Sequence, residues 1–123
     1  MTEKKLVAVV DDDESVRESL PDLLRSFGFE VEPFSSAEAF LAAGGAQRAD
    51  CLVLDVAMPG MSGPELQREL AGRSRNIPIV FITSLMDETI APRLIKRGAI
   101  ACLSKPFSET AILEAVNAAL AIS

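Results

Sequence analysis

The chain has 123 residues, of which 49% are apolar, and it carries a formal net charge of −6 with no histidine. That length suits one domain with a single core, and the missing histidine excludes a histidine general base, phosphodonor or metal ligand. The acidic balance also argues against direct nucleic-acid binding, because the protein would repel the phosphate groups.

Short apolar runs alternate with segments of helical spacing along the whole chain. In chain order, the predicted strands are Leu6–Val10, Phe29–Phe34, Cys51–Asp55, Ile79–Thr83 and Ile100–Leu103. The predicted helices cover residues 14–27, 36–43, 63–72, 87–97 and 108–121. The sequence contains no internal repeat, low-complexity stretch or linker, so we expect residues 1–123 to form one domain.

Caps and prolines mark the limits of several of these helices. Ser35 or Ser36 and Ser108 stand where N-caps are expected. Pro21 and Pro92 fall inside predicted helices, where a proline kinks the helix or restarts it. The helices are expected to stop at three glycines, Gly28, Gly44 and Gly98. If the helix around Pro92 begins late, residues 85–91 would form a mobile loop.

Strands that alternate with helices indicate a parallel sheet covered on both faces. The first, third and fourth strands are apolar throughout, as central buried strands are. The second strand alternates and contains Pro33, which suits a sheet edge. Right-handed crossovers then predict an α/β fold, a doubly wound, flavodoxin-like (βα)₅ sandwich with strand order 2-1-3-4-5. Ligands of such sheets bind at the carboxyl ends of the strands.

Polar residues gather at those carboxyl ends, and in chain order they are Asp11, Asp12, Asp13, Asp55, Thr83, Ser84 and Lys105. If the first, third and fourth strands adjoin, these side chains share one pocket. Clustered carboxylates require a compensating cation, and Mg²⁺ prefers such oxygen ligands. An ammonium group from Lys105 would pair with Asp55. These groups suit phosphoryl transfer to the Asp55 carboxylate.

Most of these residues also have an ordinary structural explanation. Asp13 or Glu14 can simply cap the following helix. Thr83 at a strand end can reflect β propensity, and Lys105 before a proline can belong to a surface turn. Asp55 is the exception, since a carboxylate that ends a buried apolar strand is costly unless it is used.

Four longer stretches carry a family resemblance: Val9–Glu14, Leu52–Gly63, Ile79–Ser84 and Gly98–Phe107. Together they closely resemble the receiver domains of bacterial response regulators, over essentially the whole chain, and they are most similar to FixJ-type regulators. The resemblance implies a cytoplasmic phosphoprotein of a two-component phosphorelay. Asp55 would be its phosphoacceptor and a sensor histidine kinase its donor.

The resemblance also implies a set of metal ligands. Asp12 would bind Mg²⁺, or Mn²⁺ in its place, directly, and Asp11 would bind it through water. Asp55 and the backbone carbonyl of Ala57 would complete the protein's share of the metal shell.

Further residues are implied to contact the phosphoryl group. Lys105 would bind it, held by a cis peptide before Pro106, and the hydroxyls of Thr83 and Ser84 would donate to it. Ala57 and Leu85 would flank it, at positions where side chains tune hydrolysis. The small Ala57 would leave access open to water, whereas the apolar Leu85 could not orient a water, so the lifetime of the phosphoryl group stays undetermined.

One position departs from the family pattern. Receivers usually carry Phe or Tyr three residues before the lysine, as an aromatic switch that moves with the threonine, and here that residue is Cys102. We therefore expect an altered or weaker switch. Cys51 and Cys102 are both expected to stay reduced in the core, and two thiols alone form no metal site. A redox role for Cys102 is the less favoured alternative.

Phosphorylation is expected to act through the face made by the fourth helix, the fifth strand and the fifth helix. That face would control dimerisation or dock an output module, which in FixJ-like proteins is a helix-turn-helix domain that regulates transcription. An apolar strip of Ile90, Leu94 and Ile95 would contribute to the contact. Because no apolar run reaches the length of a membrane span and no leader is evident, we expect a cytoplasmic protein without a membrane partner.

Two other functions stay open from the residues alone. An aspartyl-phosphate phosphatase would require a second acid two residues after Asp55, where Ala57 stands. A pseudo-receiver would act by protein contact without phosphorylation, and the missing aromatic keeps this alternative open. Neither is preferred to a receiver that takes up and hydrolyses its own phosphoryl group and is not a turnover enzyme.

Overall fold

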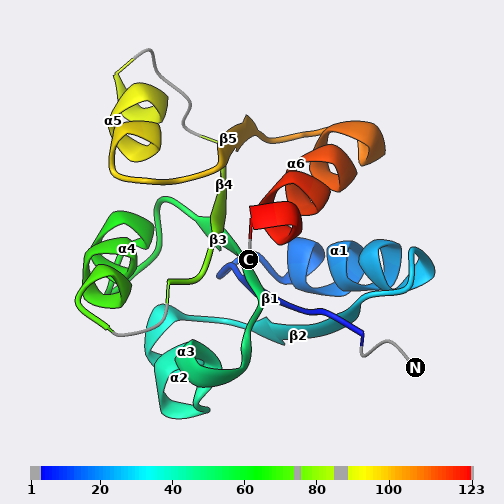
Figure 1. Cartoon of the computed structure of the whole chain (residues 1–123), viewed down its shortest axis with the longest axis horizontal. Coiled ribbons are helices and arrows are strands. Elements are labelled where there is room, and N and C mark those ends of the chain that lie inside the picture. The colour runs from blue at the N-terminus through cyan, green and yellow to red at the C-terminus, as the bar shows by residue number, and fades with distance from the viewer. Residues whose placement is uncertain (1–3, 74–75, 85–88, 123) are drawn as a thin grey trace.

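The computed structural model describes residues 4–73, 76–84 and 89–122 and shows a central sheet between two layers of helices (Figure 1). The strands are β1 Leu6–Val10, β2 Glu30–Phe34, β3 Cys51–Asp55, β4 Ile79–Thr83 and β5 Ala101–Ser104. They are parallel and form one sheet in the order β2-β1-β3-β4-β5. The predicted doubly wound topology is therefore confirmed.

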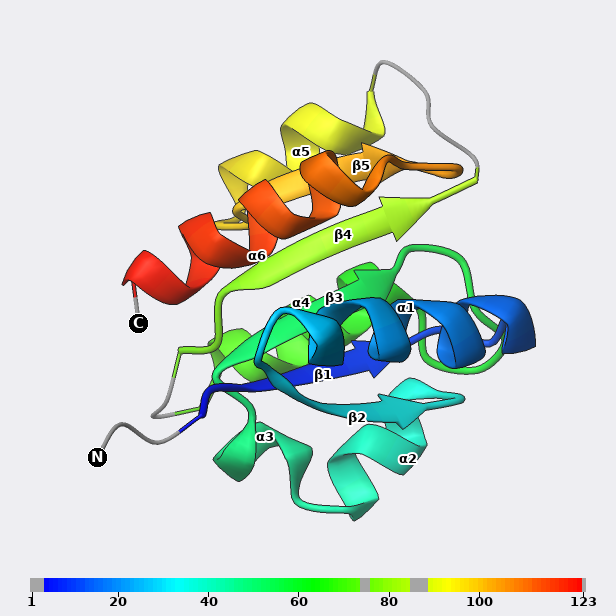
Figure 2. The same cartoon turned by 90° about the vertical axis from the view of Figure 1, so that its right-hand side faces the viewer.

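The helices are α1 Glu14–Ser26, α2 Ala37–Ala42, α3 Gly45–Arg48, α4 Gly63–Ala71, α5 Ile90–Lys96 and α6 Glu109–Ile122. Helices α1 and α6 cover one face of the sheet, and α2 to α5 cover the other (Figures 1 and 2). The short helix α3 was not predicted. It begins after Gly44, whose φ of 76° ends α2 and turns the chain into a second helical turn.

Successive residues of the central strands enter two separate apolar layers. One layer joins the sheet to α1 and α6, and its fully buried members include Val7, Val9, Val53, Ile82, Leu24, Ile112 and Val116. The other lies under α2 to α5 and includes Val10, Leu52, Leu54, Phe81, Phe40 and Leu66. Burial on both faces explains why these strands are continuously apolar, whereas Pro33 in the edge strand β2 is exposed.

The predicted caps are present in the structure. Ser36 accepts a hydrogen bond from the backbone N–H of Ala39 at the start of α2. Ser108 accepts one from Ala111, with 3.0 Å between nitrogen and oxygen. The three predicted stop glycines all have positive φ.

The two prolines behave differently. Pro92 is the third residue of α5, where a backbone N–H has no partner within the helix, so the late helix start is confirmed. Pro21 lies inside α1, which is continuous from Glu14 to Ser26, so a restart at Pro21 is wrong. Pro21 is buried, as are Leu20 and Leu24 of the same helix, and burial of the proline ring offsets the hydrogen bond that a proline cannot make. The predicted mobile loop concerns mainly residues 85–88, which lie outside the described residues.

The predicted apolar strip on α5 requires correction. Leu94 is 3% exposed and belongs to the core, and Ile90 is partly buried against the same layer. Only Ile95 of the three is well exposed, at 44%. The strip cannot act as a unit, because the helix turns Leu94 toward the sheet.

Across the described parts of the chain, the structure contains no helix long and apolar enough to cross a membrane.

Candidate functional site

Asp11 is the first residue after β1, and it is completely buried. Its N–H donates to the carbonyl of Phe34 across 3.1 Å, and its Oδ1 accepts from the backbone N–H of Asp13 at 2.9 Å. Arg17 donates from Nη1 to the Asp11 carbonyl oxygen at 2.9 Å. The carboxylate is therefore held at the carboxyl edge of the sheet.

The next two acids have different places. Asp13 is the N-cap of α1, and its Oδ1 accepts from both the N–H and the hydroxyl of Ser15. These hydrogen bonds lower the pKa of the Asp13 carboxyl. Asp12 is exposed at the rim of the site. The capping explanation thus holds for Asp13, whereas the exposed Asp12 carboxylate lies against that of Asp55.

Asp55 ends β3, between β1 and β4, and its register partner in β4 is Ile82. Only 5% of the residue is exposed. Burial, followed by the charge of Asp11, raises the pKa of Asp55 to about 7, although Lys105 opposes the shift. A carboxylate in this place is costly unless a cation faces it.

Asp11, Asp12 and Asp55 form the acidic cluster. Each can place one carboxylate oxygen within 4.8 Å of the others. Hard oxygen donors from two adjacent strands are the ligands that suit a divalent cation such as Mg²⁺. The sequence prediction that these acids converge is confirmed by their geometry.

Lys105 follows β5, and its backbone N–H donates to the Thr83 carbonyl at 2.8 Å. The peptide between Lys105 and Pro106 is cis, as the resemblance implied. The ammonium nitrogen lies 2.8 Å from Oδ2 of Asp11 and 3.7 Å from Oδ2 of Asp55. The predicted pair with Asp55 is thus the longer of two contacts, since the fully buried Asp11 has the greater need of a counter-charge.

Neighbouring carboxylates keep the Lys105 side chain protonated. Burial by itself would lower the pKa of the ammonium, but the hydrogen bond and charge of Asp11, and then the charges of Asp55 and Asp13, raise it overall. The site therefore holds a permanent cation directly against two of its carboxylates.

The two hydroxyl residues at the end of β4 differ in exposure. Thr83 is completely buried and pairs in register with Ser104, while Ser84 is exposed. Ala57 is exposed two residues beyond Asp55, and Leu85 lies outside the described residues. Thr83, Ser84 and Ala57 are thus at the same sheet edge as the acidic cluster.

Both cysteines are free thiols in the described structure. Cys51 is completely buried, and desolvation, together with the charge of Asp50, raises its pKa to about 12. Cys102 is half-buried opposite Phe81, and burial also raises its pKa. Raised pKa values make both thiols poor nucleophiles at neutral pH.

Cys51 is accordingly expected to resist alkylation. At pH 8, iodoacetamide should modify it at least about 100-fold more slowly than a free thiol, because its thiolate population is small and its sulfur is inaccessible. Cys102 should react first. Intact-mass time courses in buffer and in urea measure this, and equal native rates for the two cysteines would contradict the assigned burial.

Sequence reasoning missed Arg17. The residue lies in the first turn and a half of α1, and its side chain reaches back to the end of β1. Side chains of a helix lean toward its N-terminus. A basic residue one turn after the N-cap Asp13 could therefore have been predicted to reach the end of β1.

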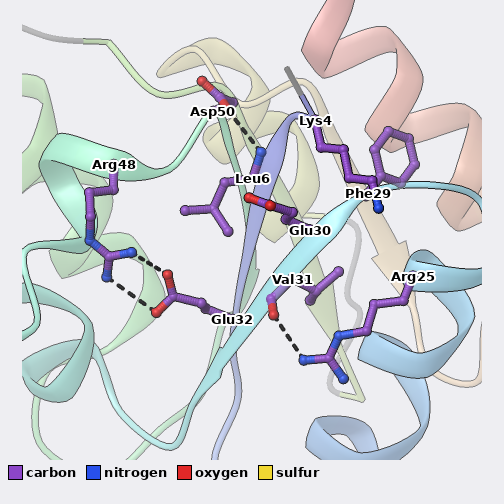
Figure 3. Close-up of a pocket in the computed structure, with 9 residues that line it drawn as sticks. All are labelled: Lys4, Leu6, Arg25, Phe29, Glu30, Val31, Glu32, Arg48 and Asp50. Carbon is purple, nitrogen blue, oxygen red and sulfur yellow. Dashed lines mark hydrogen bonds and ion pairs between the residues drawn. The ribbon is translucent and has the colours of Figure 1, made fainter. Parts of the chain in front are cut away.

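A separate pocket lies at the opposite end of the sheet, near the starts of β1, β2 and β3 (Figure 3). It has a volume of about 820 Å³. Arg48 forms an ion pair with Glu32, Arg25 donates to the Val31 carbonyl, and Asp50 accepts from the N–H of Leu6. These charges are used internally, and the pocket is remote from the acidic cluster.

Comparisons with known proteins decide the family. Residues 7–117 match the response regulator receiver domain. The chain belongs to the response regulator receiver domain family. Its similarity covers nearly its whole length, and receiver domains of this family work in phosphorylation-based two-component signalling.

Three relatives illustrate the similarity. The response regulator protein TmoT of Ectopseudomonas mendocina is 45% identical over 98% of this chain and 55% of TmoT. The transcriptional regulatory protein FixJ of Azorhizobium caulinodans is 45% identical over 98% of this chain and 57% of FixJ. The solved structure of the response regulator StyR has 52% identity and a TM-score of 0.89, covering 98% of this chain and 61% of StyR. This receiver therefore spans little more than half the length of these relatives.

Proposed function

We propose that this receiver domain takes up a phosphoryl group on Asp55 in a Mg²⁺-dependent reaction. The observation that carries the proposal is the approach of three carboxylates, from Asp11, Asp12 and Asp55, with the Lys105 ammonium against two of them. Cations on one side and a buried nucleophile on the other are the requirements of phosphoryl transfer.

The metal ligands would be the carboxylates of Asp11, Asp12 and Asp55 together with the carbonyl of Ala57. Bound there, Mg²⁺, or Mn²⁺ in its place, would neutralise the carboxylates and the charge of the incoming phosphoryl oxygens. Asp11 is buried and fixed by hydrogen bonds to the backbone, so its carboxylate has little room to move toward a metal. We therefore assign it a contact with the metal through a water molecule.

A carboxylate oxygen of Asp55 would attack phosphorus while the bond from phosphorus to the donor breaks. With a sensor histidine kinase this is a P–N bond, whose electron pair leaves with the imidazole. Lys105 would turn from Asp11 toward a phosphoryl oxygen. Thr83 and Ser84 would donate their hydroxyl protons in hydrogen bonds to the other oxygens.

Hydrolysis would restore Asp55 by attack of water on the phosphoryl group. The small, exposed Ala57 leaves the approach open. Because the acyl phosphate forms on the domain's own carboxylate, each uptake is followed by one loss. We propose that the phosphorylated state, and not the released phosphate, is the output, so the chain acts as a switch rather than as a turnover enzyme.

Phosphorylation would bias the conformation of the α5–β5–α6 face. This is the face predicted as the fourth helix, fifth strand and fifth helix, because the short helix α3 shifts the labels by one. A second copy of the chain or an output domain would bind there. Thr83 ends β4 and is bonded through its carbonyl to Lys105, so movement of either residue reaches β5. Cys102 in β5 replaces the usual aromatic switch residue. Since the named relatives are longer response regulators, we propose that residues 1–123 act as one receiver unit within a cytoplasmic regulator of transcription.

Phosphoryl labelling tests the proposal. Acetyl phosphate with Mg²⁺ should add one phosphoryl group to the intact mass, and EDTA should abolish the addition. Borohydride reduction of the acyl phosphate should map the modification to the peptide that contains Asp55. If wild-type protein gains no mass with saturating donor and metal, the domain works by contact alone and the proposal fails.

A further inference from the structure

The loop between β3 and α4, residues 56–62, follows Asp55 directly and contains Ala57. Its start is fixed to the sheet, because the N–H of Val56 donates to the Ile82 carbonyl at 3.1 Å. Its end returns to its start, because the N–H of Gly63 donates to the Val56 carbonyl at 3.0 Å. The middle of the loop requires a separate support.

Glu38 of α2 provides a support from outside the loop. Its Oε2 accepts a hydrogen bond from the N–H of Met61 at 2.9 Å. A Cβ atom placed on the neighbouring Gly60 would lie 2.7 Å from the same oxygen, and Gly60 has a φ of 73°. The loop backbone thus approaches this carboxylate so closely that a side chain at position 60 would displace the end of Glu38, and the positive φ itself favours glycine.

Helix α2 is a firm base for this contact. Its N-terminus is capped by Ser36, and Phe40 is completely buried. The ring of Phe40 meets that of Phe34 edge to face, with 5.6 Å between ring centres. Glu38 therefore projects from an element that is itself anchored to the sheet.

We propose that Glu38 is a positioning residue, whose carboxylate holds the Gly60–Met61 backbone so that the Ala57 carbonyl stays in place for the metal. The inference rests on the proposed function of the site. Mg²⁺ requires nearly ideal octahedral geometry, so a small displacement of one carbonyl lowers its affinity. Glu38 touches neither the metal nor the phosphoryl group and acts through the loop.

A charge effect is the competing explanation, because Glu38 also carries a negative charge against the loop that contains Ala57. Glu38→Gln keeps an oxygen acceptor but removes the charge, whereas Glu38→Ala removes both. Glu69→Ala is the matched control, since Glu69 is an exposed carboxylate on α4 that pairs with Arg73 at 3.3 Å.

The test combines amide exchange at Met61 with Mg²⁺ titration of the full chain, both followed by NMR. In Glu38→Ala, exchange of the Met61 amide should be about tenfold faster, as for the loss of one hydrogen bond. The dissociation constant of this variant for Mg²⁺ should rise about three- to tenfold. That is somewhat less than the effect of mutating a residue that hydrogen-bonds directly to a metal ligand. Glu38→Gln and Glu69→Ala should stay within about twofold of wild type, and thermal melts check that each variant is folded.

Several outcomes would overturn the inference. Faster Met61 exchange with unchanged Mg²⁺ affinity would mean that the contact is only structural. Equal weakening in Glu38→Ala and Glu38→Gln would assign the effect to charge. If wild type itself bound no Mg²⁺ and accepted no phosphoryl group, the proposed function would fail as well, whereas a working wild type with unaffected variants would remove only the role of Glu38.

Discussion

Asp55→Asn is expected to abolish phosphoryl uptake from acetyl phosphate, because the amide cannot replace the carboxylate nucleophile. The substitution is nearly isosteric, so the side chain can occupy the same position between β1 and β4. Residual labelling should be below about 1% of wild type, a loss of more than about 100-fold. Intact-mass analysis at matched donor and Mg²⁺ concentrations measures it.

The same substitution should stabilise the metal-free fold. It removes one of two neighbouring, buried carboxylates, Asp55 and Asp11, that share one ammonium. We expect a gain of about 1–3 kcal/mol in the free energy of unfolding in EDTA. Saturating Mg²⁺ should shrink or reverse this difference in stability, because the variant lacks one carboxylate that would bind the metal and is therefore stabilised less by it.

Asp22→Asn is the control for both effects. Asp22 is an exposed carboxylate on α1 that pairs with Arg25 at 3.5 Å, so its loss should change neither labelling nor stability appreciably. Uptake in Asp55→Asn at wild-type level would show that another residue is the acceptor. A variant that is less stable than wild type in EDTA would contradict the repulsion assigned to the acidic cluster.

Gly63→Ala is expected to disturb both stability and the site. An added Cβ would lie 2.2 Å from the carbonyl oxygen of Asp55 and 3.0 Å from the ring of Phe81. The carbonyl belongs to a buried strand, so α4 must move away from the sheet. Overpacking of this kind costs about 1–3 kcal/mol and sometimes more.

Phosphorylation should slow in the same variant. Asp55 carries both the affected carbonyl and the reacting carboxylate, and a shift of about 1 Å in a reacting group can cost about 100-fold in rate. Urea unfolding and the time course of acetyl-phosphate labelling give the two effects separately.

Gly72→Ala provides a matched comparison at the other end of α4. Gly72 has a φ of −82°, and its added Cβ would lie 3.7 Å from the carbonyl of Glu69. This substitution should be neutral or stabilise the fold by about 0.4–1 kcal/mol, because it restricts the unfolded chain. Equal unfolding free energies for Gly63→Ala and Gly72→Ala would contradict the close packing described at Gly63.

Much of the architecture was determined by local sequence. The continuous apolar runs, the serine caps and the stop glycines fixed the strands to within a residue and most helices to within one or two. The order of the strands followed from the chirality of parallel crossovers. This order placed Asp11, Asp55, Thr83 and Lys105 at one edge of the sheet, as the structure confirms. The residues of the candidate site could therefore be predicted from the sequence, because they stand at the ends of strands that are adjacent in the fold.

Contacts between distant segments were decided only by tertiary structure. The preference of Lys105 for Asp11 over Asp55 depends on their relative burial, which periodicity does not reveal. The hydrogen bond from Met61 to Glu38 joins residues 23 positions apart, and neither residue has a local signature for it. Packing likewise drew Leu94 into the core and kept α1 continuous through Pro21. Sequence patterns report the preferences of each segment, whereas these contacts arise when the burial of one segment against another outweighs those preferences.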